Sequence, residues 1–174
     1  MEAVTDTTNA PEGASTPQDA RVQEPYRQEA GTILLAATPI GDVRDASPRV
    51  VAALAGADIV AAEDTRRALA LASRLGIKLG GRLVALHDHN EAEKAAGIVE
   101  AASAGARVVF VSDAGMPTVS DPGFRLARAA IDAGVPLSVL PGPSAPLVAL
   151  ALSGLPSDRF AFEGFLPRKD GDAT

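Results

Sequence analysis

RVVFVSDAGMPTVSDPG, residues 107–123, joins an apolar run to a loop of small and turn-forming residues. The run RVVFV is rich in β-branched and aromatic residues, which is typical of a buried strand. Two glycines, two prolines and two aspartates follow within twelve residues, and Asp121-Pro122 has the pattern of a helix start. The segment therefore predicts a strand, a loop and a helix, with few packing side chains in the loop.

The same unit repeats along the chain. Strands are predicted at residues 32–37, 57–62, 82–86, 107–111 and 135–140, and helices at 47–55, 65–75, 90–104, 121–134 and 144–153. Ser47 and Asn90 are the expected N-caps of two of these helices. Strands that alternate with helices predict an α/β fold with a mostly parallel, five-stranded sheet. Because the strands are apolar on both faces, we expect helices on both faces of the sheet.

The ends of the chain differ in composition from its middle. Residues 1–30 contain three prolines and few apolar residues, which predicts a disordered tail. Residues 1–31 carry six acidic and two basic side chains, and so hold −4 of the net charge of −6. We expect the α/β domain at residues 31–156 and the start of a linker at residues 157–174.

The composition also narrows the class of protein. Without cysteine, the chain has neither disulfides nor thiolate metal sites. No apolar run reaches the length of a membrane span, and the N-terminus lacks a signal-peptide pattern, so a cytoplasmic protein with no membrane partner is expected. Residues 32–174 are near neutral and carry no basic stripe. RNA binding would therefore need local arginine clusters or a preformed ribonucleoprotein surface.

Five loops follow the predicted strands. They are residues 38–46, 63–65, 87–91, 112–120 and 141–144. In a parallel sheet such loops meet at the carboxyl edge, where ligands bind. Neither GxGxxG nor GxxxxGK[ST] occurs, so no dinucleotide fingerprint or P-loop is indicated. Gly41, Gly115 and the PGPS turn would let a ligand approach the main chain, although each loop alone is also compatible with a tight turn.

Two of these loops carry titratable side chains. EDTRR (residues 63–67) and HDHNE (residues 87–91) contain both histidines of the chain and several acids. Histidine titrates near neutral pH, so a general base or a substrate clamp is one reading. The alternatives are a helix N-terminus with solvated arginines, and a helix cap at Asn90 beside surface histidines. A metal site would need a third ligand from the few nearby carboxylates, and none is expected.

The loop strings together resemble a known family. They are ATPIG from Ala37, AEDTR, HDHNE, SDAGMP, SDPG, PGPSA, SGLP and EGFLPRK. In order and spacing they resemble the ribosomal RNA small subunit methyltransferase I family, within the tetrapyrrole methylase-like (class III) superfamily. The resemblance runs from about Thr32 to Lys169 and covers the N-terminal domain of a two-domain family. Two residues depart from the pattern, namely Asp42, where the family usually has Asn, and Met116, where it usually has Thr.

The resemblance implies transfer of a methyl group from S-adenosyl-L-methionine to the ribose 2′-hydroxyl of a cytidine. That cytidine would lie in the decoding region of 16S rRNA, within the 30S subunit. The resemblance also implies a cofactor cleft between two domains, and it allows a homodimer. It places the cofactor at Pro39, Ile40, Gly41, Asp113, Ala114, Gly115, Met116, Ser144 and Ala145, and the RNA at Thr65, Arg66, Asn90 and Glu91.

Catalytic roles follow from residue chemistry on this surface. His87 or His89 is the expected base for the ribose hydroxyl, and Glu63 or Asp64 is expected to orient the ribose. Two other functions stay open. The chain could be a non-catalytic cofactor- or partner-binding domain, or it could belong to a methylase of a small tetrapyrrole.

Overall fold

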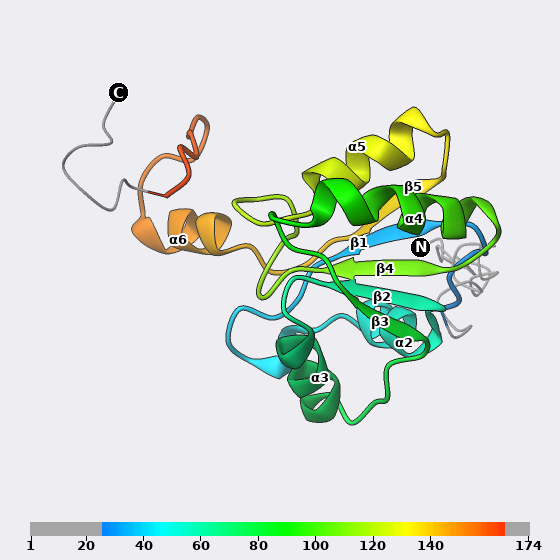
Figure 1. Ribbon diagram of the computed structural model, residues 1–174. Coiled ribbons are helices and arrows are strands. Elements are labelled where there is room, and N and C mark those ends of the chain that lie inside the picture. Colours follow the sequence, from blue (N-terminus) through cyan, green and yellow to red (C-terminus); the bar gives the residue numbers. More distant parts are fainter. Residues whose placement is uncertain (1–25, 166–174) are drawn as a thin grey trace, which may run out of the picture.

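The computed structural model describes residues 26–165, which form a five-stranded parallel sheet between helices (Figure 1). The strands are β1 (Ile33–Ala36), β2 (Ile59–Ala62), β3 (Arg82–Ala85), β4 (Val108–Val111) and β5 (Leu137–Leu140). The helices are a 3₁₀ turn (Val43–Asp45), α2 (Pro48–Gly56), α3 (Thr65–Arg74), α4 (Glu91–Ser103), α5 (Phe124–Asp132) and α6 (Ala145–Ser153). The predicted α/β class and the five parallel strands are confirmed.

Alternate side chains of the central strands enter two separate cores. Ile33, Leu35 and Phe110 pack with residues of α4 and α5 on one face. Leu34 and Val109 pack with residues of α2 on the other. This alternation follows from the two-residue period of a strand, and it explains why these strands are apolar throughout. Figure 1 shows α4 and α5 on one side of the sheet and α2 and α3 on the other.

The strand order β3-β2-β4-β1-β5 creates a switch point between β1 and β4. The chain leaves β1 toward α2 on one face, and it leaves β4 toward α5 on the opposite face. Two neighbouring strands whose connections part in this way leave a crevice at their carboxyl ends, and ligands of open α/β sheets bind there. The fold therefore directs attention to the loops after β1 and β4.

The start of α2 agrees with the prediction from the sequence, whereas the start of α5 differs from it. Ser47 caps α2, and its Oγ accepts from the amide of Val50 at 3.2 Å. The expected start at Asp121-Pro122 is wrong, because α5 begins at Phe124 after Gly123, whose φ is +118°. Glycine reaches this conformation without steric cost, but it has no side chain with which to cap the helix.

The predicted tail and linker lie only partly within the described residues. Residues 26–30 fall within the predicted tail, yet Gln28 is buried and donates to the carbonyl oxygens of Thr32 and Val108 at 2.8 and 2.9 Å. The ordered domain therefore begins before residue 31. Residues 1–25 of that tail and residues 166–174 of the predicted linker lie outside the described residues.

Helix α6 projects from the carboxyl edge of the sheet, away from the other helices (Figure 1). None of its residues is buried, and Leu152 is 83% exposed. The β5 strand, which precedes α6 in the chain, is an edge strand, with Ser138 and Val139 exposed. Helix cover is thus complete over the central strands and incomplete at this edge. Within residues 26–165, no helix has the length and apolar character needed to cross a membrane.

Candidate active site

Three loops meet at the carboxyl edge beside the switch point. Thr38 and Gly115 exchange two main-chain hydrogen bonds, of 2.9 and 3.0 Å, which tie the loop after β1 to the loop after β4. A Cβ on Gly115, whose φ is +81°, would lie 3.3 Å from Cγ2 of Ile40 and 3.5 Å from the carbonyl oxygen of Pro143. Because Gly115 has no side chain, the loop after β4 can lie close to Ile40 and Pro143, which a larger residue at this position would prevent.

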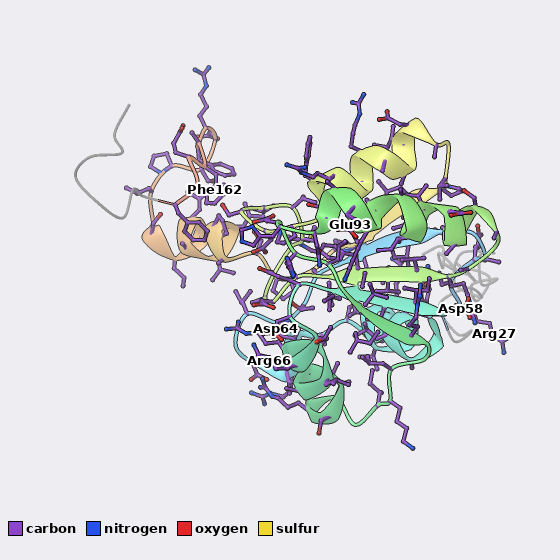
Figure 2. The ribbon with its side chains drawn as sticks, viewed as in Figure 1. Arg27, Asp58, Asp64, Arg66, Glu93 and Phe162 are labelled. Atoms are coloured by element: carbon purple, nitrogen blue, oxygen red, sulfur yellow. The ribbon has the colours of Figure 1, made fainter. Side chains whose placement is uncertain are left out.

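A cavity of about 240 Å³ opens among these loops. Six of the predicted cofactor residues line it: Ile40, Ala114, Gly115, Met116, Ser144 and Ala145. An adjoining apolar cavity of about 410 Å³ shares Met116 and Ser144 with it and extends to Phe160 and Phe162. Figure 2 shows Phe162 beside α6. The sheet thus brings most of the predicted cofactor residues to one hollow, although their loops are separate in the sequence.

The other three predicted cofactor residues lie elsewhere. Pro39 and Asp113 line a different cavity, of about 200 Å³, between the same two loops and α3. Gly41 is exposed, and its carbonyl oxygen accepts from the Arg74 guanidinium at 3.3 Å. We call the space at Pro39 and Asp113 the α3 cavity. Thr38, Arg67 and Arg74 also line it, although no site is predicted for them from the sequence, and so does Asp64, one of the predicted catalytic residues.

The α3 cavity contains polar atoms that the described residues leave without partners. Thr38 is 2% exposed, and its Oγ1 makes no hydrogen bond there. Oδ2 of Asp113 pairs with the Arg67 guanidinium at 3.3 Å, while Oδ1 is shielded and unpartnered. Buried polar groups are normally paired, so these atoms mark a place where a ligand or water would bind.

Glu63 lies between the loop that carries His87 and His89 and the loop after β4. Its Oε2 accepts from the amide of Asp113 at 3.1 Å. Partial burial raises the pKa of Glu63, and the nearby carboxylates of Asp113, Asp121 and Asp88 raise it further. Burial likewise raises the pKa of Asp121. These carboxyls therefore hold protons more readily than exposed carboxyls do.

Asp64 has a local role at the start of α3. Its Oδ1 accepts from the amide of Arg66 at 2.8 Å, and its Oδ2 pairs with the Arg66 guanidinium at 2.7 Å. The Arg66 guanidinium holds the pKa of Asp64 well below its usual range. Asp64 is thus a charged helix cap, which makes it a weak proton acceptor. Thr65 follows as the first residue of α3, and Figure 2 shows Asp64 and Arg66 there.

The loop at His87 is organised by Asn90. The amide of His87 donates to Oδ1 of Asn90 at 2.9 Å, and Nδ2 of Asn90 lies 3.1 Å from Nε2 of His87. Since an amide nitrogen only donates, Nε2 of His87 is the acceptor in this contact, while Nδ1 is buried and has no partner among the described residues. Asn90 occupies the N-cap position of α4, as predicted, and its carbonyl oxygen accepts from the amide of Lys94 at 3.0 Å, but its side chain makes no cap hydrogen bond. His89 is exposed, with its ring centroid 6.0 Å from that of His87.

Glu91 does not lie on the RNA-facing surface expected from the sequence. It is 2% exposed, and its Oε1 accepts from the amides of Gly123 and Leu126 at 3.0 and 2.9 Å. The carboxylate from α4 therefore supplies the cap that Gly123 cannot provide for α5. A glutamate in a first helical turn is common, so the sequence contains no signal for this contact across 32 residues.

No metal centre forms among residues 26–165, where no three histidine or carboxylate side chains converge. The charged and titratable side chains at this edge are instead three arginines, several carboxylates and two histidines: Arg66, Arg67, Arg74, Glu63, Asp64, Asp113, Asp121, His87 and His89. Such a set can bind phosphate and ribose hydroxyls and can move a proton.

Comparison with known proteins gives consistent matches. The chain matches the family of tetrapyrrole (corrin/porphyrin) methylases over residues 32–172. It is 57% identical over 140 residues to the ribosomal RNA small subunit methyltransferase I of Mycobacterium tuberculosis (strain H37Rv), covering 80% of this chain and 49% of that protein. With the enzyme of the same name from Haemophilus influenzae it shares 48% identity over 139 residues, or 80% of this chain and 48% of that protein.

A solved structure agrees with the fold. Uroporphyrin-III C-methyltransferase from Thermus thermophilus superimposes with a TM-score of 0.53 at 28% identity, covering 72% of this chain and 53% of that chain. The present chain spans about half the length of the curated relatives it matches. From the family match over most of its length, and from relatives of 48–57% identity, the chain belongs to the tetrapyrrole methylase family of methyltransferases.

Proposed function

We propose that this chain supplies one half of the active site of a cytoplasmic S-adenosyl-L-methionine-dependent RNA methyltransferase. The acceptor is the ribose 2′-hydroxyl of a cytidine in the decoding region of 16S rRNA, in the 30S subunit. The single observation that carries the proposal is the 240 Å³ cavity lined by six residues of the ATPIG, SDAGMP and PGPSA loops. The names of the relatives support RNA as the substrate.

The cavity fits a nucleoside-containing cofactor in its chemistry. Gly115 and Ala114 open the main chain to a ligand, because neither carries a side chain beyond Cβ. The adjoining cavity at Phe160 and Phe162 is apolar, and walls of this kind favour the binding of a planar base. Met116 lines both cavities, which supports a role at the cofactor despite its departure from the family pattern. The cofactor would supply an electrophilic methyl group on a sulfonium.

The chain's own residues would bind the ribose and move its proton. In the transfer, the ribose oxygen forms a bond to the methyl carbon, the carbon–sulfur bond breaks, and the hydroxyl proton passes to a base. Asp64 and Nε2 of His87 are engaged in local hydrogen bonds, which favours His89 as the base and Glu63 as the residue that orients the ribose. Alignment of the hydroxyl with the methyl group would provide much of the acceleration.

A transfer assay tests this function. Undermethylated 30S subunits are incubated with the protein and S-adenosylmethionine labelled in its methyl group, and the digested RNA is analysed for 2′-O-methylcytidine by mass spectrometry. His89→Ala should lower turnover and change its pH dependence, whereas His87→Ala should change turnover less. Unchanged turnover in both variants would exclude histidine as the base.

Two outcomes would favour other functions. Cofactor binding by calorimetry without transfer to RNA would indicate a cofactor- or partner-binding unit. Methyl transfer to a uroporphyrin-type substrate, with none to RNA, would favour a tetrapyrrole methylase. The second is tested because the superimposed solved structure is a uroporphyrin-III C-methyltransferase.

A further inference from the structure

The α3 cavity is separate from the cavity assigned to the cofactor. It lies between α3 and the loops after β1 and β4, and has a volume of about 200 Å³. Thr38 lines this cavity, and its hydrogen-bonded partner Gly115 lines the other. The two cavities are therefore neighbours with the Thr38–Gly115 pair between them.

The arginines of the α3 cavity are available to an anion. The Arg67 side chain is 65% exposed and pairs with Asp113 at 3.3 Å, and Arg74 contacts the Gly41 carbonyl at 3.3 Å. An exposed ion pair of this length contributes little to stability, so its guanidinium can bind another partner at low cost. Guanidinium groups bind phosphate strongly and with defined geometry.

The inner wall of the cavity supplies hydrogen-bonding groups of a different kind. Thr38 Oγ1 can donate and accept, and Asp113 Oδ1 can accept, yet neither has a partner among the described residues. Thr38 is only 2% exposed, so solvent scarcely reaches its side chain. A ligand with hydroxyl groups at one end and a phosphate at the other matches this distribution.

We infer that the α3 cavity is a subsite for one ribonucleotide of the RNA, with its phosphate at Arg67 and Arg74 and its ribose hydroxyls at Thr38 and Asp113. The choice of RNA rests on the proposed function. Because the Thr38–Gly115 pair lies between this cavity and the cofactor cavity, the bound nucleotide is a neighbour of the methyl acceptor in the RNA. The site thus fixes the position of the strand.

Titration of the ¹⁵N-labelled chain with cytidine 5′-monophosphate tests the subsite by NMR. Saturable shifts are expected at amides around the cavity, such as those of Ala68 and Leu71. Deoxycytidine 5′-monophosphate should bind about threefold or more weakly, because one ribose hydroxyl is missing. Equal affinity for inorganic phosphate would show an anion site only and would overturn the inference. No shift at these amides would overturn it as well.

Two variants with a matched control test the residues. Arg67→Gln should weaken nucleotide binding about tenfold, as expected for a lost charged hydrogen bond. Arg128→Gln should leave it unchanged, since Arg128 is similarly exposed and paired with Asp132 but lies on α5. Equal losses in both variants would show nonspecific charge attraction and would overturn the inference.

Thr38→Val separates binding from folding. The variant should weaken nucleotide binding about threefold or more, while the melting temperature of the ligand-free protein stays the same or rises, because an unpartnered buried hydroxyl is removed. Unchanged nucleotide binding would overturn the role of Thr38. A lower melting temperature with proportionate loss of binding would show a structural role and overturn it equally.

A parallel titration with S-adenosylmethionine separates this inference from the proposed function. The cofactor should shift the amides of Gly115 and Ser144 and leave those of Ala68 and Leu71 in place. Cofactor shifts without nucleotide shifts would overturn the subsite alone. Nucleotide shifts without cofactor shifts would support the subsite and contradict the cofactor site.

Discussion

Glu91 holds together two parts of the carboxyl edge that are distant in the chain. Its carboxylate, on the first residue of α4, accepts from two amides at the start of α5. The loop after β4 is therefore fixed at Gly115 by Thr38 and at Gly123 by Glu91. Met116, which is proposed to line the cofactor cavity, lies between these two attachments.

Glu91→Ala should lower the free energy of unfolding by about 2–3 kcal/mol, because it removes a helix cap and leaves buried amides without an acceptor. Glu91→Gln retains an acceptor oxygen and loses only the charge, so its effect should be about 1 kcal/mol or less. Urea denaturation measures both. The control is Glu93→Ala, on the exposed side of the same helix. A loss in Glu93→Ala equal to that in Glu91→Ala would contradict the capping role.

Gly123 and Gly97 form a second contrasting pair. A Cβ on Gly123 would lie 2.7 Å from Cε1 of Phe110, at a φ of +118°. Gly123→Ala should therefore destabilise the protein by about 2–4 kcal/mol. No atom lies within 4 Å of a Cβ on Gly97, inside α4, so Gly97→Ala should stabilise it by about 0.5–1 kcal/mol. Thermal or urea unfolding measures the change in stability of each variant. Equal changes in the two variants would show that the left-handed conformation at Gly123 accommodates a side chain without strain.

At the scale of helices and strands, the positions that depend on local sequence patterns could be predicted. The five strands and five of the helices lie within two or three residues of their expected positions, because apolar runs and Gly or Pro breaks are local signals. The start of α5 was wrong, since Asp121-Pro122 matches a cap pattern while the cap comes from α4. A cap supplied by another helix has no local signature.

The candidate site was predictable to a similar extent. The loops at Ile40, Gly115 and Ser144 meet as parallel topology requires. The sequence could not show that Asp113 faces a different cavity from Gly115, because neighbouring residues of a turn point to different sides. The same limit applies to Asn90, whose side chain bonds back to His87 and the Ala85 carbonyl rather than to α4.

The amino edge of the sheet is stabilised by one ion pair between strands. Three hydrogen bonds of 2.8–2.9 Å join Asp58, before β2, to the amide and guanidinium of Arg107, before β4. Figure 2 shows Asp58 at the end of the sheet opposite Asp64. The Arg107 side chain lowers the pKa of Asp58 from 3.8 to about 2.

This pKa gives a signed prediction for acid stability. A carboxyl whose folded-state pKa is lowered stabilises the protein above its unfolded pKa, near 4, and that contribution is lost as pH falls toward 2. Asp58→Asn should therefore flatten the decline of the melting temperature between pH 4 and 2. Arg107→Gln should flatten it to the same degree. An unchanged slope in Asp58→Asn would show that other carboxyls cause the decline.

At the scale of the molecule, the apolar surface of α6 and the segment after it is the least covered part. Leu147 and Leu152 of α6 are exposed, as are Leu155 and Phe165 beyond it. Apolar patches of this kind favour association between proteins. The chain spans about half the length of the relatives it matches, and the family resemblance also allows a homodimer.

We therefore expect the chain to self-associate through α6 in sedimentation velocity experiments. The double variant Leu147→Glu, Leu152→Glu should shift the distribution toward monomer. Leu69→Glu, at an exposed leucine on α3, is the control and should leave it unchanged. Association that persists in the double variant would place the contact elsewhere.

The position of β1 in the sheet has a consequence for biosynthesis. This strand is made first, but it pairs only with β4 and β5, and Ile33 has Val108 and Leu137 as its partners. On the ribosome it must therefore remain an apolar, unpaired segment until most of the domain has emerged. Such delayed closure slows folding and leaves nascent chains open to aggregation, so this domain should depend on chaperones that bind extended apolar stretches during translation.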